Sequence, residues 1–126
     1  MTTNSGLVLV VPGRPLSSND RGHWATKARH VKRVRREAFE AALEQWGNAA
    51  YARRRITRWP VDVTVIDHCR TANLRDTANA APSVKAIIDG VADYGLFPDD
   101  SGLWVAAIIF TPADKTGVDE LVLTFE

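Results

Sequence analysis

The chain has 126 residues, 45% of them hydrophobic and 25% charged, which suits one globular domain with its own core and is too short for two. Its single cysteine, Cys69, excludes an internal disulfide framework and is typical of a reducing compartment. Because the apolar run near the start, Leu7 to Val11, has only the length of a strand, we expect neither a signal peptide nor a membrane span, and a cytoplasmic protein.

The net charge of +1 conceals two halves of opposite sign. Residues 1 to 58 hold twelve of the sixteen lysines and arginines but four acidic residues, a net charge of +8. Residues 59 to 126 hold the other four basic residues and eleven acidic ones, a net charge of −7. This division indicates a polyanionic partner for the first half and a cation for the second.

The first half predicts a strand and a long helix. Leu7 to Val11 is a strand that Pro12 and Gly13 end. The stretch from Trp24 to Trp46 lacks glycine and proline and predicts a helix, followed over residues 48 to 59 by a basic connector that we expect to be helical only in part. Apolar residues at intervals of three or four predict the buried face of that helix: Trp24, Ala28, Val31, Val34, Ala38 and Ala42.

The second half opens with a strand over residues 61 to 67, where valines alternate with other residues. A loop over 68 to 81 leads to a helix that Pro82 opens and Gly95 closes. Valine and isoleucine form the apolar stripe of that helix, at Val84, Ile87, Ile88 and Val91.

Two more strands complete the expected fold. Residues 103 to 110 are apolar enough for a central strand, and residues 120 to 126 alternate as a final strand. The order β-α-β-α-β-β predicts an α+β fold in a single domain over residues 1 to 126. We expect a mixed β-sheet with both helices packed on one face of it, the last two strands forming an antiparallel hairpin and the earlier pairs being parallel.

A dense basic cluster lies on the first helix. Its members fall within ten residues, and no acidic residue precedes Glu37 there. A solvated helix face usually mixes the two signs, whereas the binding of phosphates needs an excess of positive charge, so we place nucleic acid ahead of a purely solvent-exposed face. The candidate DNA-binding residues on this helix are Lys27, Arg29, Lys32, Arg33 and Arg36.

Carboxylates follow the second strand and the second helix. Asp76 is in the loop after a strand, and Asp99 and Asp100 are in the loop after a helix, so a β-α-β unit can bring them together. A hard divalent cation relieves the repulsion between such carboxylates, and Mg²⁺ prefers a few of them with water. Lys85 points outward one turn before Asp89, where it can neutralise charge on a phosphate.

Together these residues resemble the RusA family of Holliday junction resolvases, over nearly the whole chain. The sequence RDTAN at 75 to 79 is similar to the Arg-Asp-x-Asp-Asn motif of that family, Lys85 to its helical lysine, and PDD at 98 to 100 to its double aspartate. The opening PGRPLSSNDRGHW, followed by a basic helix, also resembles the family.

The resemblance implies a Mg²⁺-dependent endodeoxyribonuclease that cleaves four-way junctions or other branched DNA in recombination and repair. It implies that Asp76 and Asp100 are catalytic, metal-binding carboxylates, with Asp99 as a further candidate ligand. Lys85, as a catalytic residue, and Arg75, as a DNA-binding residue, would act on the scissile phosphate. The family also implies a homodimer and no small-molecule cofactor, and Mn²⁺ is expected to substitute for Mg²⁺.

Two alternatives stay open. Ala78 stands where the family often has its second aspartate, so the chain could be a RusA-like protein that binds branched DNA with weak or lost cleavage. A plain α+β interaction domain, whose charges serve only the surface, is the other. Nicking of a four-way junction in Mg²⁺ separates the first alternative from a nuclease, and salt-dependent DNA affinity separates the second from both.

Overall fold

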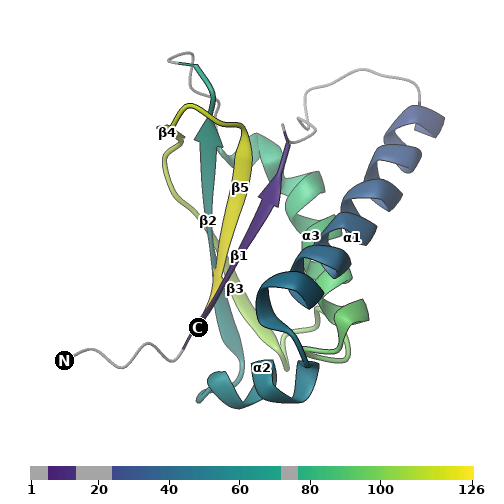
Figure 1. Ribbon diagram of the computed structural model, residues 1–126, viewed down its shortest axis with the longest axis vertical. Coiled ribbons are helices and arrows are strands. Elements are labelled where there is room, and N and C mark those ends of the chain that lie inside the picture. The colour runs from purple at the N-terminus through teal and green to yellow at the C-terminus, as the bar shows by residue number, and fades with distance from the viewer. Residues whose placement is uncertain (1–5, 14–23, 72–76) are drawn as a thin grey trace.

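The computed structural model describes residues 6–13, 24–71 and 77–126. Within these residues, three α-helices and one short 3₁₀ helix accompany five strands (Figure 1). In chain order the elements are β1 (Leu7–Pro12), α1 (Trp24–Trp46), α2 (Ala49–Arg55), β2 (Val61–Cys69), the 3₁₀ helix η1 (Thr77–Ala80), α3 (Ala81–Tyr94), β3 (Val105–Phe110), β4 (Asp114–Lys115) and β5 (Glu120–Phe125).

The strands form one mixed sheet in the order β1-β5-β2-β3, with the short β4 pairing with β2. β5 is antiparallel to both β1 and β2, whereas β3 and β4 are parallel to β2. The α+β class and the mixed sheet are therefore confirmed. The predicted element order is not matched in full, because the basic connector contains α2 and the turn region before the last strand contains β4.

The predicted hairpin of the last two strands is wrong. The crossover through α3 places β3 beside β2 as a parallel neighbour, as such connections do. The connection through β4 then leads the chain back so that β5 inserts between β1 and β2. The interior place suits β5 because Leu121, Leu123 and Phe125 alternate along it and are buried.

The prediction of a central strand over residues 103 to 110 is also wrong, since β3 is an edge strand. Only Val105 of this strand is buried, and the four residues after it are exposed. An apolar run is typical of a strand covered on both faces, but it does not say which strand lies at the edge. The alternating pattern of β5 indicates a strand with one covered face, but β1 alternates in the same way at the other edge of the sheet, so alternation does not reveal strand order either.

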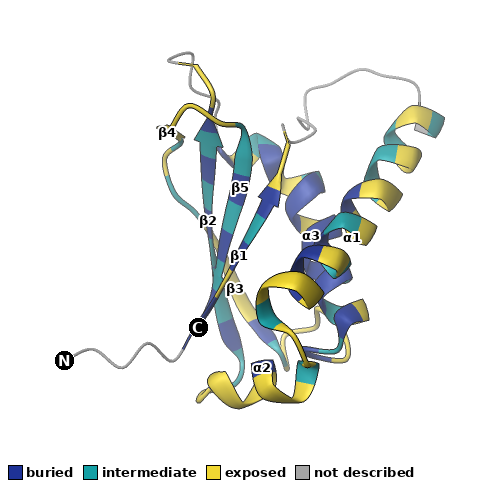
Figure 2. Ribbon diagram, viewed as in Figure 1, coloured by how far each residue is buried: buried dark blue, intermediate teal, exposed yellow. Residues whose placement is uncertain are grey.

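Both long helices cover the same face of the sheet, as predicted, and Figure 2 shows that the buried residues gather between the two layers. On β2 every second residue from Val61 to Cys69 is buried, and β1 and β5 alternate in the same way. The other face of the sheet has no helix over it among the described elements (Figure 1). Within the described residues, no helix is long and apolar enough to cross a membrane.

The predicted bounds of α1 are confirmed, but its predicted buried face is only partly correct. Val34, Ala38 and Ala42 are buried, whereas Ala28 is exposed. The reason is that the first turns of α1 extend beyond the sheet, as Figure 1 shows, so helical spacing alone did not reveal where the covering layer ends.

α1 and α3 cross in close contact at Gly90. A Cβ atom on Gly90 would stand 2.8 Å from the Cβ of Ala38 and closer still to the carbonyl oxygen of Arg35. Glycine is thus required by the close approach of the two helices rather than by a turn. Gly95, with φ of 107°, ends α3 in the left-handed conformation that the sequence predicted for the helix end.

Candidate functional site

Lys85 and Asp100 meet on the exposed side of α3. The apolar stripe of α3 faces the core, so Lys85 projects outward with 66% of its side chain exposed. Leu96 and Phe97, which are 0% and 1% exposed, anchor the chain just after α3 and turn the following loop back along the helix. As a result, Lys85 Nζ donates a hydrogen bond of 2.8 Å to Asp100 Oδ2, and the structure brings together two of the predicted catalytic residues.

Asp89 lies on the other side of the lysine, with its Oδ1 3.8 Å from Lys85 Nζ. The pKa of Lys85 is raised, first by the hydrogen bond to Asp100 and further by the charges of Asp89 and Asp100, against a smaller opposing effect of burial and of Arg35. Lys85 is therefore held in its charged form between two carboxylates.

Arg35 of α1 extends this arrangement to the neighbouring helix. Its Nε and one terminal nitrogen donate to the two carboxylate oxygens of Asp93 at 2.6 and 2.8 Å. This bidentate contact raises the pKa of Arg35 and lowers the pKa of Asp93, and the nearby charge of Asp89 also favours the charged form of Arg35. Charges of alternating sign thus run along α3, and we call this set the charge row: Asp100, Lys85, Asp89, Arg35 and Asp93.

Asp99 is placed differently from its neighbour. Its Oδ1 accepts a hydrogen bond of 2.9 Å from the backbone N–H of Ser101, and hydrogen bonding by Ser101 lowers its pKa. The carboxylate of Asp99 is thus engaged in its own turn, whereas Asp100 reaches Lys85. Of the two adjacent aspartates, Asp100 is the one that belongs to the charge row.

Of the remaining motif residues, the structure describes Ala78 but not Arg75 and Asp76. Arg75, predicted to act on the scissile phosphate, and Asp76, predicted to bind the catalytic metal, both fall outside the described residues. Ala78 is exposed on η1, which leads directly into α3. The position that lacks the family's second aspartate is thus open to solvent, and its side chain is not part of the core.

The carboxylates of the charge row suit a hard cation. No three His, Cys, Asp or Glu side chains gather into a metal site within 6–13, 24–71 and 77–126. Asp100 and Asp89 nevertheless both lie within 4 Å of the same lysine nitrogen, at 2.8 and 3.8 Å. Mg²⁺ in phosphate-binding sites uses one or two carboxylates completed by water and substrate oxygens, and Asp100 and Asp89 are carboxylates of this kind that pair with Lys85 in this structure.

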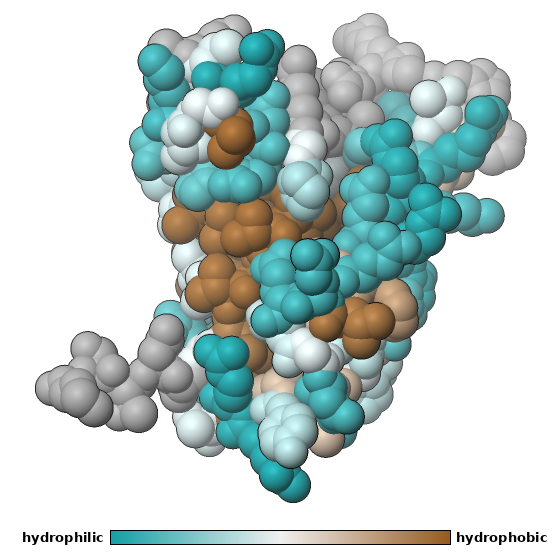
Figure 3. Space-filling view, in the orientation of Figure 1, coloured by the Kyte–Doolittle hydropathy of each residue, from teal (hydrophilic) through white to brown (hydrophobic). Residues whose placement is uncertain are grey.

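The predicted DNA-binding residues occupy α1, which Arg35 links to the charge row. Arg33 and Arg36 lie 3.7 and 3.9 Å from glutamates one turn later, and Arg33 also contacts His30. Such exposed pairs contribute little stability and leave the guanidinium groups accessible. Arg29 and Lys32 are exposed and make no ion pair with any residue that the structure describes, whereas Lys27 is half-buried. Figure 3 shows hydrophilic side chains following α1 on the viewed face.

Sequence reasoning missed Arg35 and Asp93 as a pair. The signal was present in part, because positions 85, 89 and 93 are spaced by four residues and so share one face of a helix. The contact of His68 Nδ1 with Glu120 Oε1, at 2.9 Å across β2 and β5, was also missed. No sequence signal could have found that contact, since it depends on the register of two strands that are distant in sequence.

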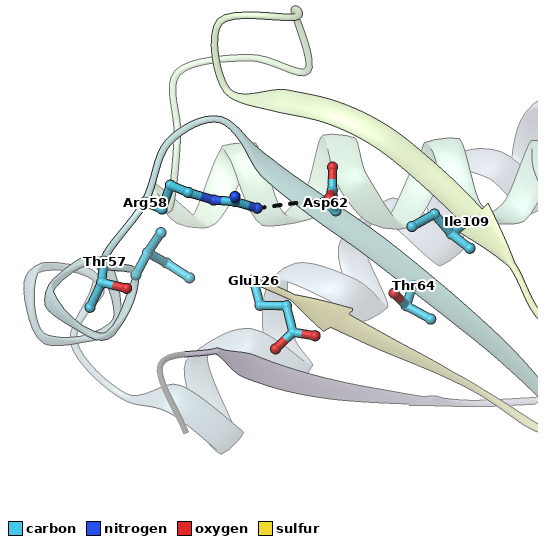
Figure 4. A pocket seen from close by; sticks show the side chains of 7 residues that line it. Thr57, Arg58, Asp62, Thr64, Ile109 and Glu126 are labelled. Atoms are coloured by element: carbon cyan, nitrogen blue, oxygen red, sulfur yellow. Dashed lines mark ion pairs between the residues drawn. The ribbon is translucent and has the colours of Figure 1, made fainter. Parts of the chain in front are cut away.

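A pocket of about 400 Å³ contains none of the predicted residues. Arg58 and Asp62, 4.0 Å apart, line it together with Ile109 and Glu126, at one end of the sheet face that no helix covers (Figure 4). A smaller pocket of about 140 Å³ lies between α1 and α3 and includes Arg33. The charge row, and not the larger pocket, therefore contains Lys85 and Asp100, the two predicted catalytic residues that the structure describes.

No family model matches this chain, and no curated protein matches it in sequence. Function is accordingly inferred from the residues themselves and from their arrangement around α3.

Proposed function

We propose that the chain is a Mg²⁺-dependent, structure-selective endonuclease that cleaves four-way junctions or other branched DNA in the manner of the RusA family. The observation that carries this proposal is the 2.8 Å contact between Lys85 and Asp100. Each residue matches a different part of the family motif, and fifteen residues separate them in sequence. Their meeting on an exposed helix face is what a shared role in catalysis requires.

Each residue has a chemical role in this proposal. Asp100 and Asp76 would hold Mg²⁺, with Asp89 as the neighbouring carboxylate. When bound, the ion polarises the phosphoryl group and lowers the pKa of a bound water. Lys85 lies beside Asp100 in its charged form, where it stabilises the negative charge that develops on the phosphate oxygens.

The basic residues of α1 supply affinity in this scheme. Arg29, Lys32, Arg33 and Arg36 are exposed on the helix that Arg35 fastens to α3. Their charges neutralise the phosphates of the junction arms, whereas the charge row acts at the cleaved bond. The side chains that bind DNA and those that cut it are thus separate sets on adjacent helices.

The experiment that tests this function uses a labelled four-way junction and a linear duplex of the same sequence. With Mg²⁺, the chain is expected to introduce nicks at the branch point of the junction and to leave the linear duplex intact, and chelation of the metal should abolish nicking. Equal cleavage of both DNAs would contradict structure selectivity, and cleavage that persists after chelation would contradict the metal requirement.

A second candidate function is binding of branched DNA without efficient cleavage. The observation that favours it is Ala78, whose position on η1 is exposed and offers no carboxylate beside the start of α3. In that case the chain would bind the junction with a salt-dependent affinity and produce no nicks at any Mg²⁺ or Mn²⁺ concentration. Replacement of Ala78 by aspartate would then be expected to create cleavage.

A further inference from the structure

The two edge strands of the sheet, β1 and β3, differ in whether their outward backbone groups are hydrogen-bonded. At the β1 edge, side chains from the end of α1 occupy the backbone groups of the strand. Gln45 accepts from the N–H of Val10 at 3.0 Å and donates to its carbonyl oxygen at 2.7 Å, and Trp46 Nε1 donates to the carbonyl oxygen of Val8 at 2.9 Å. This edge is closed by its own chain, as soluble proteins usually arrange.

The β3 edge has no such protection from any residue that the structure describes. Thr111 N–H donates to the carbonyl oxygen of Val65 on β2, so the alternation of the strand directs the N–H and C=O groups of Ile108 and Phe110 away from β2. No described residue bonds those outward groups, and β3 pairs with β2 alone. The β3 edge therefore offers unpaired backbone donors and acceptors.

The side chains around this edge are apolar and exposed. Ile108 is 41% exposed, Ile109 45% and Leu103, in the turn before the strand, 76%. Residues 101 to 113 include no Asp, Glu, Lys or Arg. Exposed edge strands in soluble proteins usually carry a charge, a proline or a covering segment, and an uncharged apolar edge strand that lacks them needs a partner.

We propose that this edge is the homodimer interface: β3 of one copy pairs antiparallel with β3 of a second copy around a two-fold axis at Ile108, giving one continuous sheet. A two-fold antiparallel pair places one residue opposite itself, and Ile108 qualifies because both its backbone groups point outward. Its N–H and C=O would bond those of Ile108 in the other copy.

The register that follows is complementary in size and brings no like charges together. Ala107 and Ile109 pair with Asp62 and Thr64 of β2, so both lie on the sheet face that no helix covers. With Ile108 on the axis, Ala107 of each copy lies opposite Ile109 of the other, so a small side chain faces a large one. Two copies meet without like charges, since residues 101 to 113 are uncharged.

A second copy, rather than an unrelated strand, is favoured by the proposed function, on which this step depends. A two-fold axis perpendicular to the sheet keeps α1 and α3 of both copies on the same side of the continuous sheet. Both charge rows and both basic helices then face one DNA molecule, as symmetric nicking of a junction requires. Face-to-face packing of the uncovered sheet faces would instead direct the two charge rows away from each other.

Sedimentation equilibrium across micromolar protein concentrations, without DNA, tests the interface. The wild-type chain is expected to be a dimer. Ile108→Lys, which places two like charges opposite each other on the axis, and Ala107→Lys are each expected to weaken dimerisation by about tenfold or more. In the double variant Ala107→Lys/Ile109→Glu the opposite charges face each other across the interface, so dimerisation should be restored.

Val8→Lys is the matched control, because Val8 is 44% exposed on β1, away from the β3 edge. It should leave the dimer intact, and circular dichroism checks that every variant is folded. A monomeric wild type, a dimer that survives Ile108→Lys, failure of the double variant to recover, or dissociation by Val8→Lys would each overturn the interface. A β3-mediated dimer that cuts no junction would leave the interface standing and remove the proposed function, whereas paired nicking by a monomer would do the reverse.

Discussion

Arg35 of α1 donates two hydrogen bonds, of 2.6 and 2.8 Å, to the carboxylate of Asp93 on α3. This contact fastens the helix that carries the predicted DNA-binding residues to the helix that carries Lys85. It lies at the same crossing where Gly90 approaches the backbone of Arg35. The ion pair and the close backbone contact thus lie at the same crossing of α1 and α3, which brings the basic residues of α1 next to the charge row.

Asp93→Asn should reduce stability in a pH-dependent way. Because Arg35 lowers the pKa of Asp93 below its usual value of 3.8, the contact stabilises the folded state above that value, and the stabilisation is lost as the pH falls through the lower pKa of the folded state. The side chains are 49% and 42% exposed, so the free energy of unfolding at neutral pH should fall by at most about 1 kcal/mol. Urea unfolding at neutral and at acid pH measures this, with Asp114→Asn as the control. A difference that persists well below the usual pKa would contradict the ion-pair explanation.

Lys85→Met should reduce cleavage far more than binding. The lysine is charged beside Asp100, where the proposed phosphate lies, and removal of one group that stabilises developing charge typically slows catalysis by about 100-fold. Single-turnover cleavage of a labelled junction, with the dissociation constant measured separately, provides the comparison. Lys115→Met, an exposed lysine on β4, is the matched control. Equal rates for the two variants would mean that Lys85 is a surface residue with no part in the chemistry.

The salt dependence of junction binding should identify the phosphate contacts on α1. Each lost contact is expected to flatten the slope of log K against log salt by about 0.9, so Arg29→Gln/Lys32→Gln should change the slope by about 1.8. Arg33→Gln/Arg36→Gln should change it less, since both arginines lie near a glutamate. Arg54→Gln on α2, at the other end of α1, is the control. If the slope is the same in all variants, the basic face of α1 does not contact DNA.

The sequence predicted the individual helices and strands better than it predicted which strands lie side by side. The apolar spacing within α1 and α3, together with Gly95, predicted the bounds of both helices closely. Periodicity and a glycine that ends a helix are local signals in the sequence. The place of β3 at the edge and of β5 inside the sheet was not predicted, because strand order depends on which faces are covered by segments distant in sequence. The same limit hid the contact between His68 and Glu120.

In the candidate site, too, the sequence predicted single residues better than the contacts between helices. Lys85 and Asp100 each match a part of the motif, and the structure places them in contact. The partnership of Arg35 with Asp93 required knowledge of how α1 and α3 cross, which spacing within one helix does not contain. Asp99 and Asp100 are adjacent in sequence, and only the turn at Ser101 distinguishes them.

Ala78→Asp should lower the metal concentration that cleavage requires. Position 78 is exposed on η1, so a carboxylate can be added there without disturbing the core. If the site follows the family layout, an extra ligand reduces its dependence on substrate oxygens to complete the coordination of Mg²⁺. Mn²⁺ should support wild-type cleavage at lower concentration than Mg²⁺. The readout is the cleavage rate as a function of metal concentration, and Ala81→Asp, an exposed position at the start of α3, is the control. If both variants behave like wild type, position 78 does not face the metal.

Nicking of a four-way junction by Asp100→Asn is the most direct measurement of the central claim, that the carboxylates beside Lys85 perform metal-dependent cleavage. Wild-type protein and the control Asp114→Asn should nick the junction in Mg²⁺. Asp100→Asn, like Asp76→Asn, should abolish nicking and bind the junction as tightly as wild type or more tightly, because a negative charge near the phosphates is removed. Nicking by Asp100→Asn at the wild-type rate, or loss of junction binding by the folded variant, would contradict the assignment.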